Sequence, residues 1–389
     1  MYTLTRRNLL SLTCFGLGMA PGWLARAATG GKKTMVVVFL RGAMDGLSVV
    51  TPFGDKAYAG YRPTLRVAEP LDLDGFFGLN PALRNFKPLW DTKQLAIVQA
   101  TGSPDTTRSH FDAQDYMESG TPGRKGTRDG WLNRALTVEK AASPIRAVAL
   151  GANLPRALRG SQAAVAVNSL SSFKVRDDAQ GDFMSMYANS NDKVLKSTSQ
   201  ETFEAVKLIE SINKQNYSPA TGSLAYPGSR FGQSLLQIAR LIKAGAGMEV
   251  AFTDITGWDT HINQAPQLNN LLGDLSAGLA AFHADLGSRM QDIVVVTMSE
   301  FGRTARENGN RGTDHGHANC MFILGGGVKG GQVHGEWPGL EPEQLYENRD
   351  LAITTDFRDV LGELTAKHLG NKNLATVFPG YTPKFRGIL

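Results

Sequence analysis

The segment Met35-Val36-Val37-Val38-Phe39-Leu40 consists of six consecutive apolar residues with three valines at its centre. A strand with one face in solvent alternates apolar and polar residues, whereas a strand covered on both faces is apolar throughout. We therefore expect residues 35–40 to form a central strand of a mainly parallel sheet, with helices on both faces.

Similar apolar runs recur along the chain and alternate with helical patterns. The other predicted strands are 95–99, 146–150, 249–253, 293–298 and 321–324, with a short strand at 163–167. Apolar residues at helical spacing predict helices at 200–216, 231–244, 268–286 and 355–369. This alternation is typical of a single large α/β domain. The polar segment 168–198 is interpreted as an insertion or lid.

The first 27 residues are typical of a twin-arginine signal peptide. Arg6 and Arg7 precede a short apolar stretch that contains glycine, and Ala25-Arg26-Ala27 supplies the small residues that a signal peptidase recognises. This stretch is too short to span a bilayer, so we expect no stable membrane anchor. The alternative interpretation is an N-terminal amphipathic helix. The twin-arginine export machinery would deliver residues 28–389 to the periplasm or the medium.

The net charge limits the kinds of partner that are expected, and the cysteine count limits the bonds that can stabilise the fold. The formal charge of +5 falls to +2 without residues 1–27, which contain three arginines and no acid. No basic tract with interleaved aromatic residues is present, so we expect no nucleic-acid partner. Only Cys320 remains after cleavage, so no intramolecular disulfide can form and the core must provide the stability.

Potential metal ligands gather in patches at the ends of predicted strands. The densest patch is the segment 313–317. The carboxyl ends of parallel strands meet at one edge of a sheet, so these side chains are expected to form one hydrolytic metal site. The candidate ligands are Asp45, Asp259, His261, Glu300, Asp314, His315 and His317.

Candidates outside residues 313–317 also have structural interpretations. An Asp-Gly pair such as Asp45-Gly46 is common in turns. Asp259 could cap a helix, and Glu300 could form an ion pair with Arg303. Residues 313–317 favour metal binding most strongly, because three potential ligands within four residues seldom serve packing alone.

Five motifs are spread over nearly the whole mature chain: residues 39–47 (FLRGAMDGL), 108–112 (RSHFD), 257–261 (GWDTH), 299–304 (SEFGRT) and 312–317 (GTDHGH). In this order they resemble the bacterial exported family catalogued as domain of unknown function 1501. That family is similar, more distantly, to the alkaline phosphatase-like superfamily, which includes sulfatases and cofactor-independent phosphoglycerate mutases. The resemblance implies a single α/β domain of that type.

The resemblance also implies a metal site with divalent ions, which could be Zn, Mn, Ca or Mg. The implied ligands include Asp45, Asp314 and either His315 or His317. Two features depart from the superfamily pattern. Asp259 and His261 are two residues apart instead of four, and Glu300 stands alone where the superfamily has an Asp-His pair. The ligand set and the number of metal ions are therefore left open.

Ser109 stands where the superfamily has its nucleophile, at the start of a helix after the second strand. Without the resemblance it would be an ordinary serine at a helix start. Arg41, Arg108 and Arg303 could bind the substrate anion, because the guanidinium fork matches its oxygens.

These expectations favour an exported metal-dependent hydrolase of a phosphate or sulfate ester, with Ser109 as a nucleophile that the metal activates. The alternative is a non-catalytic exported protein that retains the fold, with or without a metal, and binds a protein partner in the cell envelope. A fold shared with enzymes does not establish an activity.

Overall fold

A computed structural model describes residues 33–137, 143–173 and 193–389. The expected signal peptide, residues 1–27, lies outside these ranges. Of the polar segment 168–198 only the two ends are described. Its last residues belong to helix α9 (Lys193–Asn213), which begins earlier than the helix predicted at 200–216.

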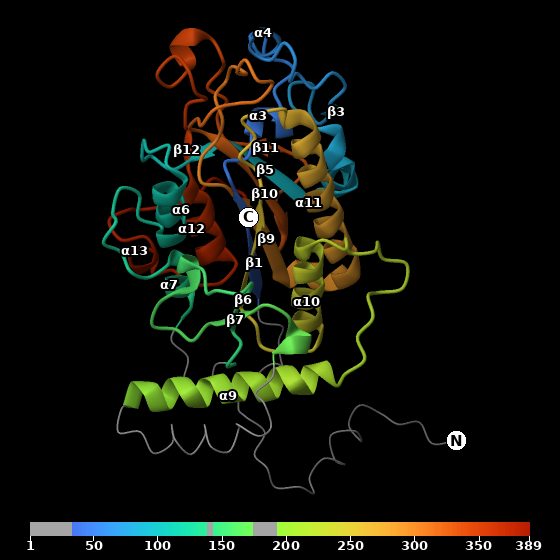
Figure 1. The fold of residues 1–389 in the computed structure, drawn as a ribbon, viewed down its shortest axis with the longest axis vertical. Coiled ribbons are helices and arrows are strands. Elements are labelled where there is room, and N and C mark those ends of the chain that lie inside the picture. Colours follow the sequence, from blue (N-terminus) through green and yellow to red (C-terminus); the bar gives the residue numbers. More distant parts are fainter. Residues whose placement is uncertain (1–32, 138–142, 174–192) are drawn as a thin grey trace, which may run out of the picture.

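One central sheet organises the described chain (Figure 1). In chain order its strands are β1 (Thr34–Arg41), β5 (Leu95–Gly102), β6 (Ala147–Leu150), β7 (Val165–Val167), β8 (Val250–Thr256), β9 (Ile293–Met298), β10 (Asn319–Gly325), β11 (Val333–His334) and β12 (Thr355–Asp356). Their spatial order is β11-β5-β10-β9-β1-β8-β6-β7, and β12 also pairs with β5. Every predicted strand lies in this sheet. A small second sheet contains β2 (Val50–Thr51), β3 (Leu71–Asp72) and β4 (Gly78–Leu79).

Helices cover both faces of the central sheet. Helices α10 (Arg230–Lys243) and α11 (Gln264–Leu286) lie on one face, and α6 (His110–Ser119), α7 (Trp131–Ala135), α12 (Phe357–Lys367) and α13 (Leu374–Val377) lie on the other (Figure 1). Further short helices are α3 (Gly46–Val49), α4 (Tyr58–Tyr61) and α5 (Lys87–Asp91). Among the described residues, no helix combines the length and the hydrophobicity needed to cross a membrane.

Strand β1 lies at the centre of the fold, as its composition predicts. It pairs in parallel with β8 on one side and with β9 on the other. Successive side chains of a strand point to opposite faces. Val36 and Val38 therefore pack with α10 and α11, while Val37 and Phe39 pack with α7 and α12. Because helices pack against both faces of β1, side chains on both faces must be apolar. This explains the unbroken apolar run.

Strand β10 departs from the parallel arrangement. It is antiparallel to both β5 and β9, so the sheet is mainly but not wholly parallel. Two antiparallel pairings in succession leave β5 running in the same direction as β9. The carboxyl ends of β1, β5, β8 and β9 therefore meet the amino end of β10 at one edge of the sheet.

Cys320 lies in β10 and is buried. Among the described residues it is a free thiol. Burial raises the pKa of this thiol well above its usual range.

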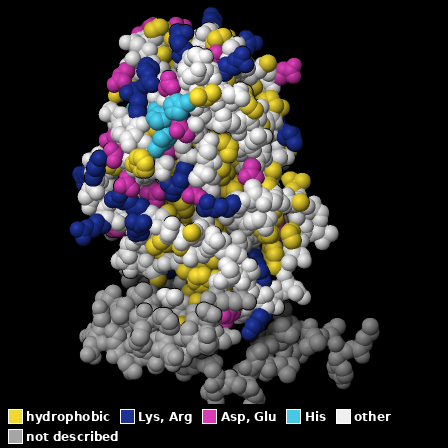
Figure 2. Space-filling model, viewed as in Figure 1, with side chains coloured by type: hydrophobic (Ala, Val, Ile, Leu, Met, Phe, Trp, Pro, Cys, Tyr) yellow, Lys and Arg dark blue, Asp and Glu magenta, His cyan; other side chains and the backbone are white. Residues whose placement is uncertain are grey.

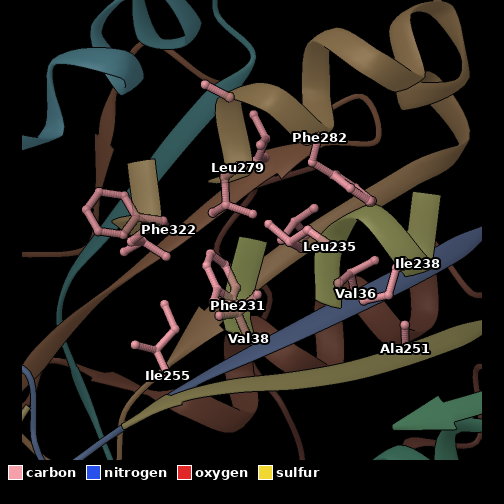
Figure 3. Close-up of a cluster of buried hydrophobic side chains, with 14 of the residues drawn as sticks. Val36, Val38, Phe231, Leu235, Ile238, Ala251, Ile255, Leu279, Phe282 and Phe322 are labelled. Atoms are coloured by element: carbon pink, nitrogen blue, oxygen red, sulfur yellow. The ribbon is translucent and has the colours of Figure 1, made fainter. Parts of the chain in front are cut away.

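The larger core lies between β1 and the helices α10 and α11. Phe231 and Leu235 from α10 and Leu279 and Phe282 from α11 share this core with Val36 and Val38 of β1 (Figure 3). These side chains are almost completely buried. Burial of this kind is the main favourable contribution to folding.

We expect Phe282→Ala to lower the free energy of unfolding by about 3–5 kcal/mol, because it leaves a cavity in this core. Phe111→Ala is the matched control, since its side chain is 89% exposed and fills no cavity. The control should change the free energy of unfolding by less than about 0.5 kcal/mol. Chemical denaturation measures both values, and equal losses would contradict the described packing.

Candidate metal centre

Three histidines and one aspartate meet at the sheet edge where β1, β5, β8 and β9 end. His110 is the first residue of α6, Asp259 and His261 follow β8, and His315 precedes β10. His315 comes before its strand because β10 is antiparallel, and an antiparallel strand begins where its neighbours end. A patch of histidine side chains is visible at the surface of the molecule (Figure 2).

The Nε2 nitrogens of these histidines approach one another closely. Nε2 of His315 lies 3.1 Å from Nε2 of His110 and 2.9 Å from Nε2 of His261. Oδ1 of Asp259 lies 3.0 Å from Nε2 of His261 and 3.2 Å from Nε2 of His315. Its separation from Nε2 of His110 is 3.5 Å. Ligand atoms bound at about 2.0–2.1 Å to a tetrahedral zinc ion would be about 3.4 Å apart, so these spacings suit a metal ion.

In each of the three rings, Nδ1 forms a hydrogen bond with an oxygen atom outside the cluster. The pairs are His110 with Oε1 of Glu300 (2.8 Å), His261 with Oδ1 of Asp314 (3.0 Å) and His315 with the main-chain oxygen of Arg108 (2.8 Å). Carboxylate and carbonyl oxygens only accept hydrogen bonds, so Nδ1 carries a proton in each ring. In a neutral ring Nε2 then presents a lone pair. Lone pairs directed at one point repel unless a proton or a cation lies between them, so this donor set fits a divalent cation.

Glu300, expected among the metal ligands, lies behind His110. Its side chain is fully buried, and Oε1 accepts hydrogen bonds from the main-chain nitrogen of Gly42 and from Nε2 of Gln114, each at 2.8 Å. Burial alone would raise the pKa of this carboxyl, but the hydrogen bonds from His110 and Gln114 lower it. The bond to Glu300 in turn raises the pKa of His110. Glu300 is therefore placed to orient the His110 ring.

Asp45 is not among the groups that the structure brings together. Its Oδ1 and Oδ2 accept from Nη2 and Nη1 of Arg62 at 3.0 and 2.5 Å, and Oδ2 also accepts from Nε2 of Gln264 at 2.5 Å. The side chains of Asp45 and Arg62 are both 0% exposed. Burial alone would raise the pKa of Asp45, but the charge and hydrogen bonds of Arg62 lower it. The carboxylate is thus engaged in a buried ion pair.

Arg303 is buried and directs its donors into the protein. Its acceptors are Oδ1 of Asp259 and the main-chain oxygens of Gly42, Ala43, Trp258 and Thr313, and its Nη1 also lies 3.5 Å from Nε2 of His261. The bond from Nη2 to Oδ1 of Asp259 is 2.6 Å long. Burial alone would raise the pKa of Asp259, but Arg303 lowers this pKa to about 2. With its donors engaged in this way, Arg303 is not placed to bind a substrate anion.

The other two arginines expected to bind an anion are less enclosed. Arg41 donates to Asp254, Gln114 and Glu118, and its side chain is 18% exposed. The Arg108 side chain is 32% exposed.

Arg108 donates through Nε and Nη2 to Asp350 and through Nη2 to Glu347. Within the described part of the chain, its Nη1 makes no hydrogen bond. Of the three arginines, Arg108 therefore offers the most accessible donor.

Ser109 and His317 lie outside the histidine cluster. Ser109 is the N-cap residue of α6, so a helix begins where the sequence predicted one. The residue is exposed, and its hydroxyl makes no capping hydrogen bond. The ring of His317 stacks on Tyr346, with the ring centres 4.4 Å apart, and burial lowers its pKa to about 4.

His110 is a member of the cluster that was not predicted from the sequence. It belongs to the motif 108–112, in which the neighbouring Ser109 was predicted to be the nucleophile. The signal that could have identified it is a histidine at the first position of a helix that begins at the ligand-bearing edge of the sheet.

Two glycines allow the motifs to approach one another. Gly42 has φ of +118°, and a Cβ atom there would lie 2.6 Å from the main-chain nitrogen of Asp259. A Cβ atom at Gly316 would lie 2.3 Å from the carbonyl carbon of Arg303. A larger residue at either position would push these segments apart, because the atoms it would meet belong to the main chain.

A family model matches residues 90–376, which contain four of the five motifs. The chain belongs to the DUF1501 family, described as a protein of unknown function. A comparison of this DUF1501 protein with curated proteins finds no significant match.

Several solved structures are similar to the DUF1501 chain at low sequence identity. The lipoteichoic acid synthase LtaP from Listeria monocytogenes is 10% identical, with a TM-score of 0.36, over 95% of this chain and 79% of that one. The PsFucS1 sulfatase from Pseudoalteromonas sp. is 11% identical, with a TM-score of 0.36, over 91% and 73%. The C-terminal periplasmic domain of EcEptC from Escherichia coli, in complex with Zn, is 9% identical, with a TM-score of 0.36, over 77% and 74%.

In this DUF1501 protein, Asp45→Asn should lower the free energy of unfolding by about 3–5 kcal/mol, because it leaves the Arg62 guanidinium buried without its counter-charge. Asp91→Asn is the matched control. Asp91 pairs with Lys87 on the surface of α5, where an ion pair contributes less than about 1 kcal/mol. Denaturant titration of both variants measures the difference, and a small loss in Asp45→Asn would show that the pair is not buried in solution.

Proposed function

We propose that this protein is a metal-dependent hydrolase of a phosphate or sulfate ester. The observation that carries the proposal is the convergence of the Nε2 nitrogens of His110, His261 and His315 on one carboxylate oxygen of Asp259. Each ring is already oriented by an acceptor on its far side. Such outer acceptors are common behind metal-binding histidines, where they fix the tautomer and the ring orientation.

His110, Asp259 and His315 would hold the ion, since one ligand atom from each lies within 4.8 Å of the others. His261 adjoins two of them and would serve as a further ligand. Imidazole nitrogen suits zinc better than magnesium or calcium, which prefer oxygen ligands, and manganese accepts mixed sets. When bound, a divalent ion would polarise the ester oxygen and favour attack on the phosphorus or sulfur atom.

Ser109 and Arg108 would provide the remaining groups. Ser109 directly precedes His110, and its exposed position leaves the hydroxyl accessible to a substrate. Arg108 would bind an ester oxygen through its Nη1 group, while its main-chain oxygen holds His315 in place. A guanidinium suits the flat array of oxygens on a phosphate or sulfate group.

We further propose that the protein acts in the periplasm or outside the cell after export by the twin-arginine machinery. The paired Arg6 and Arg7, the short apolar stretch and the small residues at 25–27 support this proposal. That machinery transports folded proteins, so a metal site could be assembled before export.

Protein purified without chelator should contain a divalent metal, measured by elemental mass spectrometry after desalting. We expect His315→Asn to lose this metal, because it removes a central ligand. We expect Glu300→Gln to weaken metal affinity by about 10–100-fold, because it releases the His110 ring. His334→Asn is the control, since His334 lies in β11 and, among the described residues, its ring forms one hydrogen bond, to the main-chain oxygen of Lys329. Equal metal retention in His315→Asn and His334→Asn would contradict the assigned site.

Turnover should be sought with a panel of aryl phosphate and aryl sulfate esters. Ser109→Ala should abolish any turnover found, without change in metal content or melting temperature, because the exposed hydroxyl makes no capping hydrogen bond to α6. Ser288→Ala is the control, since Ser288 is exposed at the opposite edge of the sheet, before β9. Wild-type turnover in Ser109→Ala would mean that water attacks the ester. Bound metal without turnover in the parent protein would instead favour a non-catalytic binding or assembly role at the cell envelope.

A further inference from the structure

We infer that this protein binds one divalent ion rather than a pair, and that the buried Arg303 guanidinium supplies the second positive charge of the site. The inference rests on the proposed metal-dependent function and specifies its ion content. It follows from the partners of the acidic side chains and from the charge around the histidines.

The acids at this sheet edge that could hold a second ion are paired with arginines or act as hydrogen-bond acceptors for the histidines. A two-metal site needs separate ligands for ions about 3.5–4 Å apart. The arginine pairs are Asp45 with Arg62, Asp254 and Glu118 with Arg41, and Asp350 with Arg108. Within the described ranges, one group of three potential ligands has the geometry to hold an ion, and it consists of His110, Asp259 and His315.

Asp314 is the remaining acid that contacts a histidine of the cluster, and its Oδ1 is already engaged. Its Oδ1 accepts from Nδ1 of His261 and from Nδ2 of Asn308. His317, three residues after it in the motif, stacks on Tyr346. A second ion bound through the other oxygen of Asp314 would not find three such ligands, because His110, Asp259 and His315 form the one group of that kind among the described residues.

Arg303 already occupies the place beside Asp259 where another cation would be expected. Nη2 of Arg303 lies 2.6 Å from Oδ1 of Asp259, and the side chain is 0% exposed. Its other partners are neutral: four main-chain oxygens, and Nε2 of His261 at 3.5 Å from Nη1. They fix the position of the guanidinium without cancelling its charge. A second divalent ion that shared this carboxylate would lie beside a fixed positive charge, and the repulsion would be strong at such short range.

The charge of the site also matches one divalent ion. Asp259 faces the histidines, while Glu300 and Asp314 lie behind two of them. These three carboxylates and the Arg303 guanidinium leave two negative charges. One divalent ion neutralises them, whereas two ions would leave an excess of positive charge in a partly buried site.

The test is the stoichiometry of metal binding by the full chain. Protein stripped with a chelator is titrated with zinc chloride, and separately with manganese chloride, by calorimetry. Metal content after desalting is measured by elemental mass spectrometry. We expect one ion per chain and a single binding transition. Two ions per chain would overturn this inference and leave the proposed metal-dependent function standing. No bound ion would overturn both.

Two isosteric variants test which carboxylates bind the ion. Asp259→Asn should weaken metal affinity by at least about tenfold, the lower end of what second-shell changes cause, because it removes a ligand. Asp45→Asn should retain one ion per chain with an affinity within about threefold of the parent, because Asp45 belongs to the pair with Arg62. Loss of one ion from a pair in Asp45→Asn would identify Asp45 as a ligand and overturn the inference. If Asp45→Asn does not fold, the titration of the parent chain still decides between one ion and two.

Discussion

The guanidinium of Arg303 holds together the segments from which the candidate site is built. It follows β9 and donates to Gly42 and Ala43 after β1, to Trp258 and Asp259 after β8, and to Thr313 before β10. A buried cation without its partners is costly, so these acceptors must be in place together. The three loops are therefore interdependent, and the histidines that they carry are positioned by the fold before any ligand arrives.

The architecture was largely predictable because hydrophobic burial determines it. Residues 35–40 are apolar throughout since helices cover both faces of β1. The direction of β10 was not predictable in the same way. An apolar run of strand length has the same pattern whether it runs up or down the sheet, and its direction depends on connections to distant residues. That direction explains why residues 313–317 reach the site from before a strand, while the other motifs reach it from after one.

The types of residue that form the site were predictable from the sequence, but the contacts between them were not. Asp259, His261 and His315 meet as expected, since acids and imidazoles at the ends of neighbouring strands must lie near one edge. Asp45 and His110 show which contacts the sequence does not predict. The partner of Asp45 is Arg62, which belongs to none of the five motifs, so no local pattern signals the buried pair. The site role of His110 depends on which of two adjacent side chains at a helix start faces the sheet edge.

The burial of Cys320 has a consequence for a protein that is proposed to leave the cytoplasm. Oxidation and disulfide exchange proceed through the thiolate, and they require access to the sulfur atom. In β10 the thiol is enclosed, and its raised pKa keeps it protonated, so the native chain resists mixed disulfides in an oxidising compartment. The same sulfur becomes reactive once the sheet opens. Its rate of modification therefore reports how often the central sheet opens, without any engineered label.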